Sequence, residues 1–113
     1  MYLDYIPDEE ETKKIMLIQR LSYIAMSLQY QANDIFHKLV DEGYIEKEDL
    51  ENFDEEKHGH SLSDIVSLTK KAQDIIKDVK EKYLSEEVDD TLEERLKEAC
   101  ILINNSEKLI ENL

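Results

Sequence analysis

The sequence predicts an all-α protein: a three- to four-helix bundle with a long N-terminal helix and a C-terminal antiparallel helical hairpin. Three observations support this. Glycine (2) and proline (1) are scarce in 113 residues, whereas an all-β chain of this length needs many turn residues. Leu, Ile, Lys and Glu are abundant, which suits helices. Apolar residues recur at spacings of three and four, as on one helical face. Residues 1–113 are expected to form a single domain.

The first helix is predicted over residues 8–42, after an N-terminal arm of residues 1–7. Pro7 suits the first turn of a helix, and the acids that follow it favour the positive end of the helix dipole. Gly43 can end the helix. At 1.5 Å per residue the helix would be about 50 Å long. Its expected core stripe is Leu17, Leu21, Ile24, Leu28, Ala32, Ile35 and Leu39.

Residues 44–60 are predicted to be an acidic connection. Nine acids and two lysines lie in residues 41–57, with few apolar residues among them. A short helix is expected around Lys47 to Phe53. The remainder, including His58-Gly59-His60, is expected to be loop.

Residues 61–113 are predicted to form the helical hairpin. Ser61 or Ser63 is the expected cap of its first helix, and Thr91 with Glu94 has the spacing of a capping box for the second. The two expected core stripes are Leu62, Ile65, Leu68, Ala72, Ile75 or Ile76, Val79 and Tyr83, and then Leu92, Leu96, Ala99, Ile103, Ser106, Ile110 and Leu113.

The first helix would be about 15 Å longer than this hairpin. Part of its apolar surface therefore needs another cover. The sequence offers three: the arm, the short acidic helix or a second copy of the chain.

The charge balance disfavours several classes of partner. Twenty-eight acids face 14 bases, a net charge of −14, so phosphate backbones and anionic membrane surfaces repel the chain. We expect neither direct nucleic acid binding nor membrane association. No stretch is apolar enough for a lipid span, and the N-terminus shows no secretory signal. Cys100 is the only cysteine, which fits a reducing compartment, and the expected location is cytoplasmic.

A second stripe lies beside the core stripe of the first predicted helix. An advance of about 100° per residue groups Tyr23, Met26, Tyr30 and His37, with Gln19 and Asn33 among them. Residues 15–33 contain one charged residue, Arg20. Tyrosine and methionine with an uncharged polar fringe are typical of protein interfaces. We expect the four residues to bind a protein partner, either a second copy in a homodimer or a partner helix. The alternative is a central helix, packed on two sides within its own chain.

Five residues are candidate metal ligands: Asp34, His37, Glu55, His58 and His60. Glu55 and His58 have the spacing that di-iron carboxylate bundles use, and Asp34 and His37 repeat it with aspartate. Such sites also need two further carboxylates that project into the core. The apolar face of the first helix offers none. We therefore expect solvated histidines beside acids, with no bound metal or other cofactor.

No catalytic motif is present. Two glycines cannot build a phosphate-binding loop, and neither a zinc-protease His-Glu-x-x-His nor a Gly-x-Ser-x-Gly elbow occurs. The expected function is therefore non-enzymatic and acts through protein–protein contacts. Two alternatives stay open. One is an acidic decoy for a nucleic-acid-binding protein, with the acids of residues 46–56 in place of phosphates. The other is a metal-dependent bundle enzyme built on Asp34, His37, Glu55 and His58.

Overall fold

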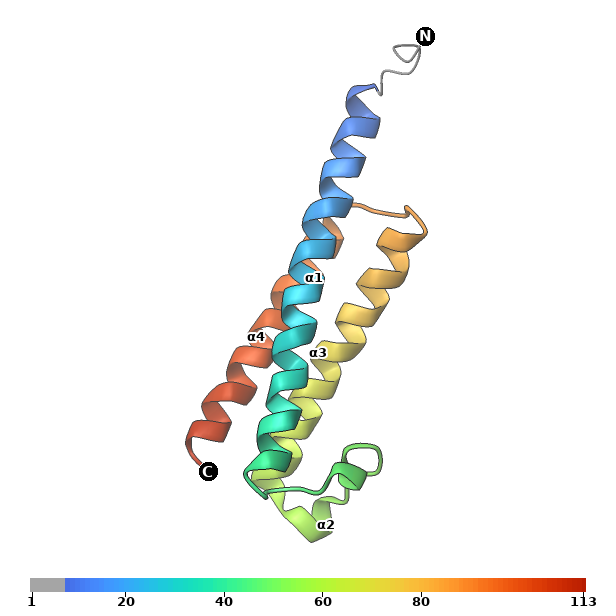
Figure 1. Cartoon of the computed structure of the whole chain (residues 1–113). Coiled ribbons are helices and arrows are strands. Elements are labelled where there is room, and N and C mark those ends of the chain that lie inside the picture. The colour runs from blue at the N-terminus through green and yellow to red at the C-terminus, as the bar shows by residue number, and fades with distance from the viewer. Residues whose placement is uncertain (1–7) are drawn as a thin grey trace.

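The computed structural model describes residues 8–113, so the arm predicted over residues 1–7 lies outside the described residues. The described residues form three long helices and two short helical turns; the long helices lie side by side, and the short turns lie at the end where the first long helix stops (Figure 1). The all-α bundle and its C-terminal hairpin are therefore confirmed. The elements are α1 (Glu9–Asp41), the 3-10 turn η1 (Lys47–Leu50), the single turn α2 (Glu55–His58), α3 (His60–Leu84) and α4 (Thr91–Glu111).

Each long helix buries one face against the other two, because its apolar residues recur with the helical period. The buried residues of α1 are Leu21, Ala25, Leu28, Ala32, Ile35 and Leu39. Those of α3 are Ile65, Val66, Thr69, Ala72, Ile76, Val79 and Tyr83, and those of α4 are Leu92, Leu96, Ala99, Ile103 and Ser106. The predicted stripes are confirmed in the main, but Leu17, Ile24 and Ile110 are only half-buried, and Leu113 is exposed beyond the end of α4. On α3, however, Val66 and Thr69 are buried while Leu62 and Leu68 are only half-buried.

Helix α1 ends before Gly43, as the sequence predicted. Gly43 has φ +80°, and its N–H donates to the carbonyl of Val40 at 3.0 Å. The N–H of Tyr44 donates to the carbonyl of Leu39 at 3.0 Å. This pair of bonds is the Schellman motif, in which glycine adopts the left-handed conformation without a steric penalty.

The predicted start of α3 is wrong. Neither Ser61 nor Ser63 caps it: α3 begins at His60, and Gly59 precedes it with φ +85° and ψ 174° and no side-chain cap. Residues 55–58 form the helical turn α2 instead of a loop, because the Asp54 side chain accepts from the Glu56 N–H at 3.0 Å. His58 therefore ends one helix and His60 begins the next.

The capping box predicted at Thr91 is also absent. Thr91 is the first residue of α4, not its cap, and its N–H donates to the Asp89 carboxylate at 2.9 Å. The Thr91 hydroxyl hydrogen-bonds to the same carboxylate oxygen. An aspartate two residues upstream forms a local turn of its own and so displaces threonine from the capping role.

The helices differ in length, and the difference appears at one end of the bundle. α1 has 33 residues against 25 in α3 and 21 in α4, and its N-terminal turns project beyond the α3–α4 loop (Figure 1). The acidic connection lies at the opposite end, where Ile45 is buried and Leu50 and Phe53 pack against the core. The short acidic helix therefore does not cover the projecting part of α1.

Candidate interaction surface

The outward face of α1 carries a line of large exposed side chains. Tyr23, Met26 and Tyr30 are 79%, 66% and 76% exposed, and His37 is exposed about two turns beyond Tyr30. They lie opposite the buried Leu21 on the helix, at about 100° per residue. All four residues predicted to bind a partner are thus on the described surface, which rules out a helix packed on two sides within residues 8–113.

Two further residues extend this face toward the N-terminus. Ile15 and Met16 are exposed, two turns before Tyr23 on α1. The sequence prediction missed them, although the same advance of about 100° per residue places both near Tyr23. We call the whole face the outer stripe; its residues are Ile15, Met16, Gln19, Tyr23, Met26, Tyr30, Asn33 and His37.

The outer stripe is nearly free of charge. Between Ile15 and Asn33 the only charged residue is Arg20, which lies on the flank toward α4 and pairs with Glu93 there. On the other flank, Asn33 accepts a hydrogen bond of 3.2 Å from Gln73 of α3. An outward helix face is normally the most charged one. Here residues 15–33 carry a single charge, in a chain with 37% charged residues.

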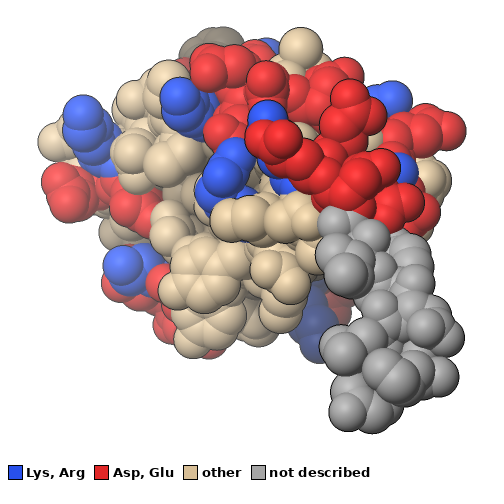
Figure 2. Space-filling model, turned by 90° about the horizontal axis from the view of Figure 1, so that it is seen from above, with Lys and Arg blue, Asp and Glu red and all other residues tan. Residues whose placement is uncertain are grey.

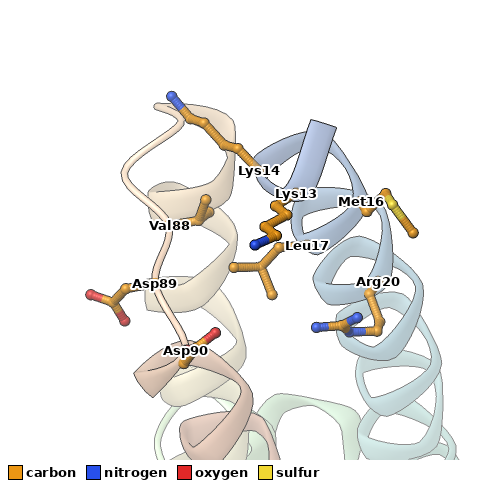
Figure 3. A pocket seen from close by; sticks show the side chains of 8 residues that line it. All are labelled: Lys13, Lys14, Met16, Leu17, Arg20, Val88, Asp89 and Asp90. Atoms are coloured by element: carbon orange, nitrogen blue, oxygen red, sulfur yellow. The ribbon is translucent and has the colours of Figure 1, made fainter. Parts of the chain in front are cut away.

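A pocket opens where α1 leaves the hairpin. It has a volume of about 470 Å³, with Leu17 pointing toward Val88 of the α3–α4 loop (Figure 3). Lys13 and Arg20 reach into it from α1, and Asp90 faces them from the start of α4. Mixed charges around a small apolar floor do not select a ligand of one sign, so this pocket assigns no ligand.

The acidic connection is held by a small cluster around Asp49. Its carboxylate accepts the Glu46 N–H at 3.1 Å and lies 3.6 Å from Nζ of Lys57. The Glu46 N–H lowers the pKa of Asp49 below its usual value; burial opposes this, and the charges of Lys57 and His58 assist it. The cluster thus neutralises part of the acidic run that the decoy hypothesis requires.

His58 is the most enclosed histidine of this connection. Its ring stacks on Phe53 with centroids 4.9 Å apart. Nε2 lies 3.1 Å from Oδ2 of Asp49, close enough for charge attraction. The geometry at Nε2 does not satisfy a hydrogen bond with any described residue. The contacts of His58 are therefore those of a packed side chain that closes the end of the bundle.

The five candidate metal ligands are divided among separate places. Asp34 and His37 lie on the exposed surface of α1, where they line an open hollow of about 290 Å³ with Tyr30 and Asn33. Glu55 pairs with His60 at 2.7 Å, and both are exposed. Among residues 8–113, no three His, Cys, Asp or Glu side chains are grouped so that they could hold a metal ion.

No family model, curated protein or solved structure matches this chain. Its function therefore has to be inferred from its own surfaces. No helix within residues 8–113 is long and apolar enough to cross a membrane.

Acidic side chains also gather at the end from which α1 projects. Figure 2 looks down on this end and shows them crowded on one side, next to a largely uncharged surface. α1 and α4 both point their N-terminal ends in this direction, although α1 begins beyond α4, and each helix start carries the positive end of its own dipole. Acids near those helix starts are stabilised by the dipoles, which gives them a structural role; they include Glu9, Glu10, Glu11, Glu93 and Glu94.

Proposed function

We propose that this protein acts without catalysis, through protein–protein contacts, and that it self-associates by the outer stripe of α1. The observation that supports the proposal is the line of exposed apolar side chains on the outward face of one helix, from Ile15 to Tyr30. Burial of such side chains against a partner is favourable by roughly 25 cal/mol for each Å² removed from water.

The charge distribution favours a second copy as the occupant. The net charge of −14 makes two copies repel one another over most of their surfaces. The outer stripe is the face on which they can approach with least repulsion. A basic partner, in contrast, would be drawn to the acidic ends of the bundle and not to an uncharged helix face.

The projecting turns of α1 give a second argument. Ile15 and Met16 are exposed on α1, near the end from which its first turns project, and η1 and α2 cover the other end of the bundle. Of the three covers expected from the sequence, the arm and a second copy remain. A second copy carries a stripe of the same length, about 33 Å from Ile15 to His37, and so can cover the whole of it.

The size of the stripe sets the expected affinity. A strip about 33 Å long and about 10 Å wide buries roughly 300–400 Å² on each copy, below the roughly 800 Å² of a standard interface. We therefore expect a weak dimer, with a dissociation constant in the micromolar range or above.

Sedimentation velocity over a concentration series, from about 10 μM to about 1 mM, tests the proposal. The mean mass of the parent chain should rise with concentration, and Tyr30→Glu should remain a monomer. Ile101→Glu is the matched control, because Ile101 is also exposed but lies on α4, away from the stripe. It should associate like the parent. A parent chain that stays monomeric throughout, or two variants that behave alike, would contradict self-association by this face.

The decoy of a nucleic-acid-binding protein is the alternative, and the acids at both ends of the bundle favour it. Salt separates the two functions. Added salt screens the mutual repulsion of two acidic copies and should strengthen self-association. It should weaken binding of a basic partner to the acidic ends.

A further inference from the structure

The flank of the outer stripe toward α4 carries charges in an ordered pattern. At about 100° per residue from Tyr23, the exposed Glu9, Lys13, Asp34 and Lys38 all fall within about 80° on this side. Along α1 their signs read minus, plus, minus, plus. The exposed Arg20 lies on the same flank between Lys13 and Asp34, and it is already paired with Glu93 of α4. Glu9 and Lys13 already form an exposed pair at 3.5 Å. Asp34 and Lys38 have no ion pair with another residue of the described range.

When a second α1 helix is placed beside the first in the reverse direction, each negative charge in this order meets a positive one. In an antiparallel pair of α1 helices, a two-fold axis perpendicular to both helices brings the same flank of each copy together. With Tyr23 beside that axis, Lys13 of one copy lies at the same level along the helices as Asp34 of the other. Glu9 likewise comes to the height of Lys38. Symmetry repeats both pairs, so four pairs of opposite charges cross the interface.

A parallel pair cannot form these contacts. Its two-fold axis runs along the helices, so this flank of one copy lies beside the opposite flank of the other. Lys13 of one copy and Asp34 of the other are then about 30 Å apart along the helices, and Glu9 and Lys38 are further apart still. The charges therefore separate the two arrangements, although the apolar side chains alone allow both.

The apolar part of the outer stripe agrees with the same alignment. Its ends, Ile15 and Tyr30, lie nearly the same distance in sequence from Tyr23. An antiparallel pair centred there places Met16 of one copy opposite Tyr30 of the other. The exposed apolar side chains of both copies are then covered together, without an overhanging end.

We infer that two copies pack through α1 in antiparallel orientation, with Tyr23 beside the two-fold axis and with Lys13–Asp34 and Glu9–Lys38 pairs between the copies. The inference rests on the proposed self-association and adds its geometry.

Disulfide trapping tests the orientation. Cys100 is the only cysteine, so Cys100→Ser gives a background in which Tyr23→Cys, Met16→Cys and Tyr30→Cys are each introduced alone. A disulfide requires Cα atoms within about 7 Å. In the antiparallel pair, Tyr23→Cys should cross-link with itself. Met16→Cys and Tyr30→Cys should each fail alone, since Met16 and its counterpart are about 20 Å apart along the helices, but should cross-link when mixed.

The outcomes separate the two proposals. Self-cross-linking of Met16→Cys and of Tyr30→Cys would show a parallel pair, which overturns the orientation and leaves self-association standing. Failure of all cross-links, in a background that sedimentation shows to be a dimer, would overturn the alignment at Tyr23. A monomeric background would overturn the proposed function itself.

A charge exchange tests the ion pairs. Lys13→Glu alone, and Asp34→Lys alone, should each weaken the dimer roughly three- to tenfold, because each places two pairs of like charges across the interface. The double variant should recover the affinity of the parent. Lys97→Glu is the matched control for Lys13→Glu, since it changes the net charge equally at an exposed site on α4. A double variant no tighter than either single variant would overturn the pairing.

Discussion

The hydroxyl oxygens of Thr69 on α3 and Ser106 on α4 lie 3.1 Å apart, and both side chains are fully buried. The Ser106 hydroxyl donates to the Leu102 carbonyl of its own helix at 3.1 Å, and the single proton of the Thr69 hydroxyl is shared between the Ser106 oxygen and the Ile65 carbonyl, which lies 2.7 Å away. A polar pair in an otherwise apolar interface favours one relative height of two helices, because a shift by one turn would separate the partners.

This arrangement predicts a small and coupled loss of stability. Ser106→Ala should lower the free energy of unfolding by about 1 kcal/mol, since Thr69 keeps its bond to the Ile65 carbonyl. Thr69→Val should cost a similar amount. The double variant should cost less than the sum, because it leaves neither hydroxyl without its partner. Urea unfolding of all four proteins measures the coupling, and strictly additive losses would contradict it.

The exposure of the outer stripe predicts that its residues contribute little to folding. Met26→Ala should change the free energy of unfolding of the monomer by less than about 0.5 kcal/mol. Leu21→Ala, which empties a fully buried site on the same helix, should cost about 2–5 kcal/mol. Both are measured by urea unfolding at a concentration where the chain is monomeric. Comparable losses would mean that the stripe is buried within one chain.

The two glycines differ in a way that alanine substitution can measure. A Cβ at either position meets nothing within 4 Å, so only the backbone opposes the change. Gly43 ends α1 in the left-handed conformation, where alanine costs about 1–2 kcal/mol. Gly59, with φ +85° and ψ 174°, occupies a region almost restricted to glycine, where strain is of order 1–3 kcal/mol. We expect Gly59→Ala to lower the thermal midpoint more than Gly43→Ala does. The reverse order would contradict this account of the bend between α2 and α3.

The lowered pKa of Asp49 predicts a pH-dependent contribution to stability. A carboxyl with a lower pKa when folded binds its proton more weakly in the native state. It therefore stabilises the fold above its unfolded pKa of about 3.9, and this contribution is lost as the pH falls through the folded value. Asp49→Asn should lower the thermal midpoint at pH 7, where the Glu46 N–H loses its charged acceptor. The difference from the parent should shrink below about pH 4, and a constant difference across this range would contradict it.

Periodicity was sufficient to predict which residues of α1 are buried. Leu21, Leu28 and Ile35 recur at helical spacing, and helical geometry then leaves one face for the core. The ends of the helices were not predictable in this way. At α4 the choice depends on whether Asp89 or Thr91 supplies the first acceptor, and at α3 it depends on a bend at Gly59. At both helix ends, neighbouring groups compete to cap the helix, and their contributions to stability differ by about 1 kcal/mol.

The candidate surface was predicted only in part. The composition around Tyr23 and Met26 indicated an interface, but the pattern could not tell a solvent-facing helix from one covered twice. That distinction depends on where η1 and α2 pack, which is a matter of tertiary structure. Ile15 and Met16 were missed because the predicted stripe began at Gln19; their exposure depends on how α1 packs against α3 and α4.

The alignment of the three long helices has a consequence for relaxation measurements by NMR. The bundle is long and narrow, with extents of 64, 23 and 21 Å, and the backbone N–H bonds of a helix point along its axis. Most N–H bonds of α1, α3 and α4 are therefore nearly parallel to the long axis of the molecule, which reorients slowly. Their amides should share a high ratio of transverse to longitudinal ¹⁵N relaxation rates. The connection through η1 and α2 runs across the end of the bundle (Figure 1). A lower ratio there will reflect the orientation of its N–H bonds before it reflects any internal motion.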